Sequence, residues 1–216
     1  MGMFLRRGHA PELGTPIGSL DVGTVIKLNE NGSPAKFYVA KHDYESKLNG
    51  NGRTLVVRKD CYDKRAFSDN ANAFSGSSMD TWLNGTYKGF LDADVQDAMG
   101  LTAFYYTPGN GNNTVSVLNR AVFLLSATEL GTSGSTGNTE GTALSSAVCS
   151  QLAIAYRNGS AVTQWTRTPS TNYNGYVVHL NTEGGPRINY FSDSSGSRPV
   201  FTLPASFKLT DDMLAA

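Results

Sequence analysis

The sequence has little charge, and its two signs are balanced. Charged residues make up 17% of the 216 residues, against about 25% in an average domain. The 18 Lys and Arg residues equal the 18 Asp and Glu residues in number, so the net charge is zero. A nucleic-acid partner is therefore not expected, because it would require a basic patch.

Cysteine and histidine are scarce as well. The chain has two cysteines, Cys61 and Cys149, and three histidines. Two cysteines do not make a disulfide framework, and we expect both to be buried free thiols. With so few possible ligands, no zinc site is expected.

The sequence also lacks a long hydrophobic run. No stretch approaches the roughly 20 apolar residues of a membrane span, and the first residues lack the apolar core of a signal peptide. We therefore expect no membrane span and no export by the usual route. A chain made in the cytoplasm of a host could still act outside the cell if it is carried there on a particle.

The signatures of common catalytic sites are absent too. There is no Gly-x-Ser-x-Gly elbow, Walker loop, His-Glu-x-x-His motif or Rossmann fingerprint. His179 lies inside a strand-like run, which is a poor setting for the base of a catalytic triad. We predict that the protein is not an enzyme and that it uses no cofactor.

What the sequence does contain is a series of strand-like runs separated by Gly and Asn turns. Strands, then short helices, then strands again indicate an α+β domain of mostly antiparallel sheets. Trp82, Tyr87, Phe90 and Leu91 are expected in its core. Strands are expected over 23–28, 35–40, 53–58, 101–106, 116–125, 175–180 and 187–191, with a turn over 29–34. Short helices are expected from Ser77 or Ser78 to Gly85 and from Asp92 to Met99, a weaker one over 143–156, and an exposed loop over 131–141.

Residues 1–20 contain Met3, Phe4 and Leu5 without any period. They form either a disordered leader or an arm that docks on a neighbouring subunit, in front of a domain over residues 21–216. Zero net charge and an apolar arm both favour association. We therefore expect a homo-oligomer.

The last fifty residues combine apolar anchors with a polar middle. The stretch opens on Trp165-Thr-Arg-Thr-Pro169 and closes on Ser197-Arg-Pro-Val-Phe201, and between them Asn, Tyr, Ser and Gly predominate. This pattern is typical of a rigid scaffold that presents an adaptable polar surface. We assign Arg167 and Arg198 to the scaffold, because an arginine at the end of a buried strand usually donates to nearby carbonyls.

Taken in order, four segments resemble a family of uncharacterised domains, the DUF6273 type, common in gut Firmicutes and their phages. They are Met79-Asp-Thr-Trp-Leu-Asn84, Ala121-Val-Phe-Leu-Leu-Ser126 followed by Glu129, Trp165-Thr-Arg-Thr-Pro169, and Ser197-Arg-Pro-Val-Phe201. The third replaces the family's usual Trp-Leu-Arg-Ser. The resemblance covers about residues 20–209.

That family is similar to the C-type lectin-like fold, as in formylglycine-generating-enzyme-like domains and the variable proteins of diversity-generating retroelements. The resemblance implies a compact domain whose N- and C-terminal strands pair and whose binding face is rich in loops. The formylglycine-generating activity is not carried over, because Cys61 and Cys149 lie away from the C-terminal end where that activity needs a cysteine pair. The calcium motifs of true C-type lectins are absent, so a calcium site is possible but has no positive evidence, and no metal-binding residue is assigned.

In the retroelement-diversified relatives, the varied positions lie near the C-terminus and favour Asn, Tyr and Ser. On this basis the resemblance implies a ligand-binding set with tyrosines as anchors and Arg187 as a charged contact. Tyr176 and Tyr190 lie in strand patterns and could equally be core. The set is Asn172, Tyr173, Asn174, Tyr176, His179, Asn181, Arg187, Asn189, Tyr190, Ser192 and Asp193.

Two functions follow from these observations. The first is a binding module, a phage virion protein on the virion surface that touches a host cell-surface protein or glycan and contacts other virion subunits through its arm. The alternative is a structural decoration protein of a capsid or tail, without receptor binding.

Overall fold

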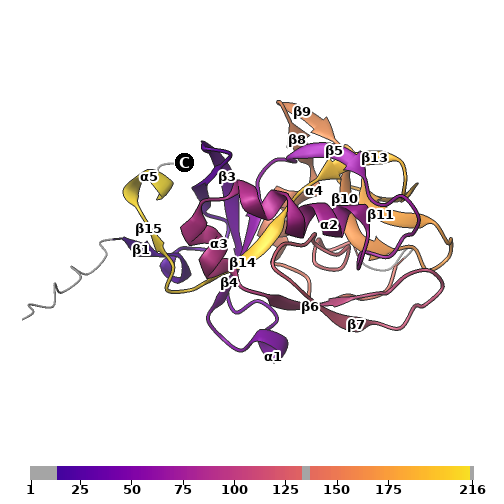
Figure 1. The fold of residues 1–216 in the computed structure, drawn as a ribbon, viewed down its shortest axis with the longest axis horizontal. Coiled ribbons are helices and arrows are strands. Elements are labelled where there is room, and N and C mark those ends of the chain that lie inside the picture. Colours follow the sequence, from indigo (N-terminus) through magenta and orange to yellow (C-terminus); the bar gives the residue numbers. More distant parts are fainter. Residues whose placement is uncertain (1–13, 133–136, 215–216) are drawn as a thin grey trace, which may run out of the picture.

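The computed structural model describes residues 14–132 and 137–214. They form a mixed α+β fold built on two main sheets with short helices around them (Figure 1). No α-helix in the described residues is longer than the eight residues of α2 and α4. The helices are α1 (Ser46–Asn49), α2 (Ser78–Gly85), α3 (Ala93–Met99), α4 (Ser146–Ala153) and α5 (Asp211–Leu214), with 3-10 turns η1 (Ile17–Ser19) and η2 (Tyr87–Phe90).

The first main sheet has four antiparallel strands in the order β14–β4–β3–β2. Its expected meander from the N-terminal half is confirmed, and a strand from the C-terminal end of the chain completes it beside β4. The strands are β2 (Val25–Glu30), β3 (Ser33–Lys41), β4 (Arg53–Arg58) and β14 (Val200–Pro204).

The second main sheet has the order β12–β11–β10–β13–β5. Only the β10–β13 pair is parallel; the other neighbours run antiparallel. The strands are β5 (Asp63–Ala66), β10 (Gln164–Pro169), β11 (Tyr176–Leu180), β12 (Pro186–Tyr190) and β13 (Ser194–Ser197). Every residue of β10 is buried, so this strand runs through the core.

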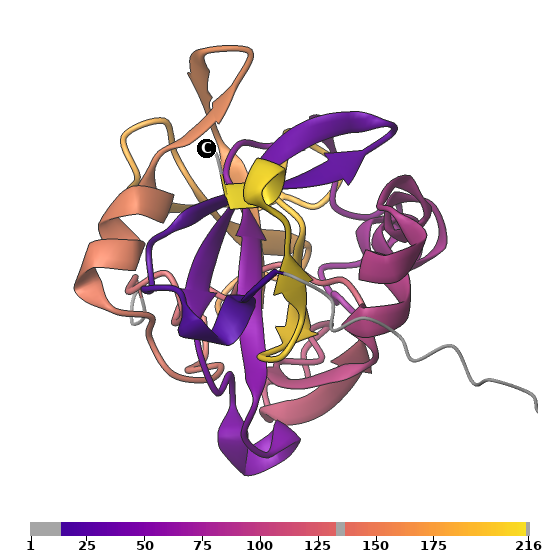
Figure 2. The ribbon, with the colours of Figure 1, turned by 90° about the vertical axis from the view of Figure 1, so that its left-hand side faces the viewer.

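Three two-stranded ribbons complete the fold. β6 (Thr102–Tyr106) pairs with β7 (Ser116–Arg120), and β8 (Ala155–Arg157) pairs with β9 (Ser160–Val162) in a hairpin that projects from the body. β1 (Thr15–Pro16) pairs with β15 (Lys208–Leu209), so the two ends of the described chain lie side by side (Figure 2).

Residues 14–20, which we placed in the N-terminal arm, pack on the domain itself. Ile17 is fully buried, and its N–H donates to the carbonyl of Phe207 at 2.9 Å. Residues 1–13, with Met3, Phe4 and Leu5, lie outside the described residues, so docking of an arm on a neighbour stays a prediction.

All three helices expected from the sequence form, as α2, α3 and α4. The Ser77 hydroxyl accepts the N–H of Asp80 at 3.0 Å, and Met79 and Leu83 of α2 are buried. α3 follows Asp92 and ends before Gly100, whose φ of 59° favours glycine. Of the four expected core residues nearby, Tyr87 and Leu91 are buried and Trp82 and Phe90 are partly buried.

The first hairpin turn is tighter than the predicted turn over 29–34. Asn31 and Gly32 have φ values of 53° and 70°, as a two-residue hairpin turn requires. β2 and β3 therefore pair up to Glu30 and Ser33. Pro34 is tolerated in β3 because that strand pairs with β4 only from Phe37 onward.

The predicted strand over 116–125 is wrong in its second half. β7 ends at Arg120, and the apolar run that follows forms only an isolated bridge between Phe123 and Val200. The run is nevertheless buried. The side chain of Asn84 replaces a strand partner there, since its Oδ1 accepts the N–H groups of Ala121 and Val122.

The prediction of buried free thiols holds for one cysteine. Both cysteines are free; Cys61 is buried, whereas Cys149 is only half-buried. Burial raises the pKa of the Cys61 thiol to about 11, so it stays protonated near neutral pH.

A fully buried arginine ties β10 to the loops around it. Neither Arg167 nor Glu129 has exposed side-chain surface, and their ion pair is 2.6 Å long. Arg167 also donates to the carbonyls of Tyr105 and Leu124 at 2.9 and 2.8 Å. Burial alone would lower the pKa of Arg167, but the carboxylate of Glu129 outweighs it and the pKa is raised.

The prediction of an exposed loop over 131–141 is wrong at Glu140, which places a second carboxylate in the core. Glu140 is fully buried, 3.9 Å from Nε of Arg167, and its oxygens accept the N–H of Thr107 at 2.6 Å and the hydroxyl of Thr168 at 2.7 Å. These bonds replace the water that the carboxylate loses. Residues 133–136 of that loop lie outside the described residues.

We call Arg167, Glu129, Glu140 and Tyr44 the ion cluster. The Tyr44 hydroxyl donates to Glu129 at 2.6 Å, and burial followed by Glu129 raises its pKa, so it remains a donor. Within the described residues, Nη2 of Arg167 has no hydrogen-bond partner. The guanidinium carbon lies 4.8 Å from the centroid of the Phe104 ring, which faces the cation instead.

Replacing Arg167 by alanine should lower the free energy of unfolding by about 3–5 kcal/mol, because it leaves Glu129 buried without its cation. Urea denaturation measures this loss. The matched control is Arg187→Ala, an exposed arginine of the same sheet, which should change stability by no more than about 0.5 kcal/mol. Equal effects of the two substitutions would contradict a central role for the ion cluster.

Candidate ligand-binding surface

The predicted binding residues of the C-terminal stretch lie on and around the β11–β12 hairpin. Tyr176 pairs with Tyr190, and His179 pairs with Arg187. Because successive residues of a strand point to opposite faces, this register divides the set between two faces. The tyrosines lie on one face of the hairpin, and His179, Arg187 and Asn189 lie on the other.

Three tyrosines form a continuous row on the first face, which we call the tyrosine row. The ring centroids of Tyr173 and Tyr176 are 6.0 Å apart, and those of Tyr176 and Tyr190 are 5.5 Å apart, both edge to face. Phe191 stacks on Tyr190 at 4.5 Å. Tyr173 and Tyr190 are 57% and 42% exposed, so the row is packed within itself and open to solvent.

The backbone before β11 is shaped to hold this row. Gly175 has φ of 88°, and a Cβ on it would lie 2.7 Å from Cε2 of Tyr190. Only glycine fits both the conformation and the contact. The hydroxyl of Ser170 accepts the N–H groups of Asn172 and Tyr173, which fixes the turn that carries Tyr173.

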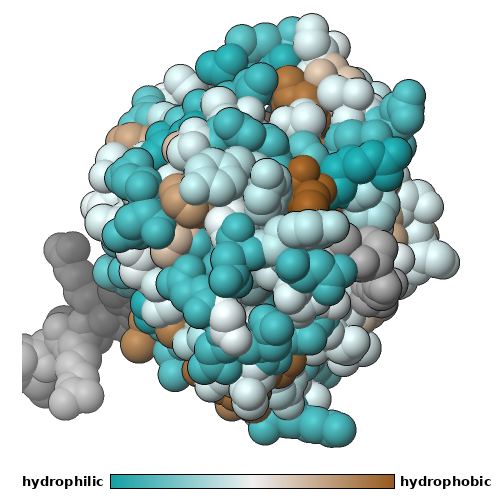
Figure 3. All heavy atoms as spheres, turned by 90° about the vertical axis from the view of Figure 1, so that its right-hand side faces the viewer, coloured by the Kyte–Doolittle hydropathy of each residue, from teal (hydrophilic) through white to brown (hydrophobic). Residues whose placement is uncertain are grey.

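The remaining polar residues of the set have different settings. Asn172, Asn174, Ser192 and Asp193 are exposed in the turns on either side of the row. The side chain of Asn181 stabilises the turn between β11 and β12, since its Oδ1 accepts the N–H groups of Glu183 and Gly185. Figure 3 shows that this end of the molecule is covered by hydrophilic and intermediate residues, with hydrophobic ones only in small spots.

His179 lies in the core side of the hairpin rather than on its surface. It is 8% exposed, and its ring centroid is 5.9 Å from that of Trp165. Burial first, and then the nearby Arg187, lower the pKa of His179 below its ordinary value of 6.5, while Asp193 opposes the shift. The imidazole is therefore neutral at physiological pH.

Sequence reasoning missed the residues that order the row. Ser170, Gly175 and Phe191 hold it in place, and only the glycine gave a local signal, as a turn former. It also missed an open cleft between α1, β6 and the segment 139–142, because the lining of that cleft comes from segments far apart in the chain.

The described residues offer neither a metal site nor a membrane-spanning helix. No group of three or more His, Cys, Asp or Glu side chains within 14–132 and 137–214 could hold a metal ion. No helix there is both long and apolar enough to cross a lipid bilayer.

The fold and this surface define a mixed α+β domain that displays an ordered, tyrosine-bearing hairpin at one end. The chain belongs to the family described as "Domain of unknown function (DUF6273)", whose model matches residues 51–205. The match begins just before β4, ends just after β14, and includes the tyrosine row and every member of the ion cluster except Tyr44. No curated protein and no solved structure matches the chain.

Replacing Arg187 by glutamine should raise the pKa of His179, because it removes the neighbouring positive charge on the same face. An NMR titration of the imidazole protons measures it. The folded-state pKa lies below 6.5, so neutral His179 stabilises the fold above that pH, and this stability is lost as the pH falls through the folded-state pKa. The control, Tyr190→Phe on the opposite face, should leave the His179 pKa unchanged; a pKa that does not rise in Arg187→Gln would contradict the assigned faces.

Proposed function

We propose that the protein is a non-enzymatic binding module that uses the tyrosine row to hold a protein or glycan on a host cell surface. The observation that carries this proposal is the row itself. Tyr173 and Tyr190 expose large amphipathic rings, and ring contacts already fix them. Binding then orders few side chains, so little affinity is lost to conformational entropy.

The residues around the row suit such a ligand. Asn172 and Asn174 are exposed beside Tyr173, and their amides both donate and accept hydrogen bonds. The zero net charge of the chain favours contact through rings and uncharged polar groups rather than electrostatic attraction. Aromatic rings with Asn and Ser neighbours are the typical composition of adaptable binding faces.

We further propose that the α+β fold is of the C-type lectin-like kind and that the module is displayed on a phage virion. Two observations support the fold: the terminal strands β1 and β15 pair, and turns that carry Tyr173, Ser192 and Asp193 flank the tyrosine row. The virion setting rests on the resemblance of the sequence to the phage variable proteins.

The test is binding of the labelled protein to intact Firmicutes cells and to their purified wall polysaccharides. Tyr173→Ala/Tyr190→Ala should reduce binding at least about tenfold, since aromatic anchors at interfaces contribute roughly 2 kcal/mol or more. Protease treatment of the cells removes a protein receptor, whereas periodate oxidation removes a glycan receptor. Loss of binding after one treatment identifies which class is bound.

The matched control is Tyr156→Ala. Tyr156 lies on the β8–β9 hairpin and is 43% exposed, almost the same as Tyr190 at 42%. Its replacement should leave binding unchanged. The proposal is wrong if Tyr156→Ala reduces binding as much as the tyrosine-row variant does, or if the protein binds no cell. Structural decoration would then be the function to test.

A further inference from the structure

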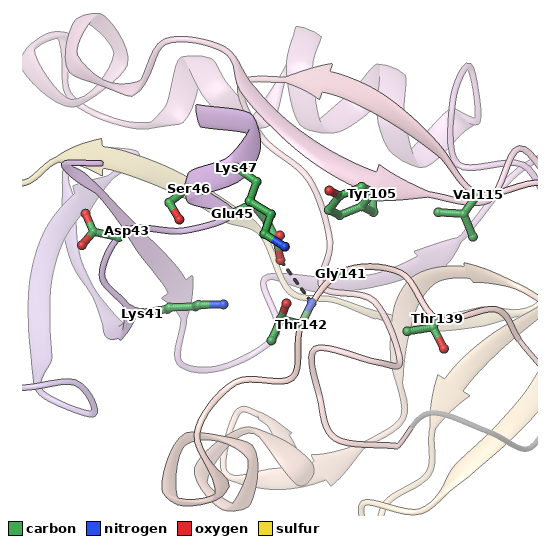
Figure 4. Close-up of a pocket in the computed structure, with 10 residues that line it drawn as sticks. All are labelled: Lys41, Asp43, Glu45, Ser46, Lys47, Tyr105, Val115, Thr139, Gly141 and Thr142. Atoms are coloured by element: carbon green, nitrogen blue, oxygen red, sulfur yellow. Dashed lines mark hydrogen bonds between the residues drawn. The ribbon is translucent and has the colours of Figure 1, made fainter. Parts of the chain in front are cut away.

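An open cleft of about 410 Å³ lies away from the tyrosine row and shares no residue with it (Figure 4). Three parts of the chain meet there: the segment from the end of β3 into α1, the β6–β7 ribbon, and the segment 139–142. Its lining residues are Lys41, Asp43, Glu45, Ser46, Lys47, Tyr105, Val115, Thr139, Gly141 and Thr142.

The floor of the cleft carries a largely buried carboxylate. Glu45 is 8% exposed, and one of its oxygens accepts the N–H of Thr142 at 3.1 Å. Its backbone is left-handed, with φ of 44° and ψ of 55°, which is a strained conformation for a residue with a side chain. Such strain persists where surrounding contacts impose it, and it gathers at ligand sites.

The floor of the cleft depends on Gly141, because a side chain at this position would fill the space beside Glu45. A Cβ on Gly141 would lie 2.9 Å from Oε1 of Glu45 and 3.3 Å from Oε1 of Glu129. The φ of Gly141 is 83°, so a side chain is disfavoured there in conformation as well. Because Glu129 belongs to the ion cluster, the floor of the cleft lies directly against that cluster.

The walls carry two lysines and a flat ring, and the carboxylate of Asp43, which also lines the cleft, accepts the N–H of Gly52 at 2.7 Å. Lys41 and Lys47 reach into the cleft in Figure 4, and within the described chain neither forms an ion pair. Tyr105 faces them across the opening, and Val115 adds an apolar wall that is 37% exposed. The hydroxyls of Thr139 and Thr142 complete the rim.

We propose that this cleft binds an anionic sugar, a pyranose that carries a carboxylate or a phosphate. The ammonium groups of Lys41 and Lys47 would hold the anion through charge-assisted hydrogen bonds. The Glu45 carboxylate accepts sugar hydroxyls, and the Tyr105 ring packs against the apolar face of the pyranose. The site does not depend on the tyrosine row, and either can fail alone.

The experiment is titration of the ¹⁵N-labelled full chain with glucuronate, glucose 6-phosphate and glucose. At least one anionic sugar should shift the amide resonances of Lys47 and Thr142 and bind about tenfold more tightly than glucose, since charge-assisted contacts are the stronger ones. A response to glucuronate alone indicates a carboxylate sugar, and a response to glucose 6-phosphate alone indicates a phosphorylated one. If neither anionic sugar binds, or glucose binds equally well, the proposal is wrong.

Two variants separate the cleft from non-specific charge. Lys41→Gln/Lys47→Gln should weaken anionic-sugar binding about tenfold, whereas the control Lys64→Gln/Lys208→Gln, which removes the same charge from exposed positions elsewhere, should not. Equal effects of the two lysine pairs would overturn the proposal, and Tyr173→Ala/Tyr190→Ala should leave binding in the cleft unchanged.

Discussion

The structure depends on one guanidinium that has no contact with water. Arg167 lies at the centre of β10, and its charge is met by Glu129, with Glu140 close by. Removing these groups from water is costly, and their attraction repays it only if the geometry is close to ideal and the remaining donors and acceptors are used. The cluster therefore tolerates few alternative arrangements of the surrounding chain.

The ion cluster also fixes loops that lie outside the strands and helices. The carboxylate of Glu129 accepts the N–H of Ser126, and that of Glu140 accepts the N–H of Thr107. Three separate segments are thereby fixed to β10. The buried run after β7 needs no continuous strand ladder, because side chains and backbone share its hydrogen bonds. Asn84 accepts the N–H groups of Ala121 and Val122, while Phe123 bridges to Val200 and the carbonyl of Leu125 accepts the N–H of Arg167.

The candidate surface follows from the same strand. β11 pairs with β10, and β12 pairs with β11, so the hairpin that carries the tyrosine row is anchored to the buried centre. The row itself is then ordered by local contacts, above all the close approach of Gly175 to Tyr190. A binding face of this kind is rigid where it is anchored and adaptable only in its side chains.

Local signals in the sequence were enough to predict several elements. The strand over 53–58 has a clear hydrophobic pattern, and the helix after Ser77 has a clear cap. The structural role of Arg198 was predicted from its position in the sequence, and in the structure it donates to the carbonyls of Arg58 and Leu152. Membership of the DUF6273 family could also be predicted from four short motifs.

Other features could not be predicted because tertiary contacts decide them. Glu140 stands in a Gly, Ser and Thr stretch that is typical of an exposed loop, and only its distant partners bury it. The division of the binding set between two faces depends on the pairing register of β11 and β12, where a shift of one residue exchanges the faces. The cleft combines segments that no local pattern connects.

Native-state hydrogen exchange at Thr107 and Ser126 tests the central claim most directly. Both amides lie outside strands and helices, where exchange normally proceeds through low-energy local opening. If the ion cluster holds the fold together, they should exchange only with global unfolding, at the same opening free energy as the amides of β4. Rapid exchange at these two positions, with β4 still protected, would contradict the account.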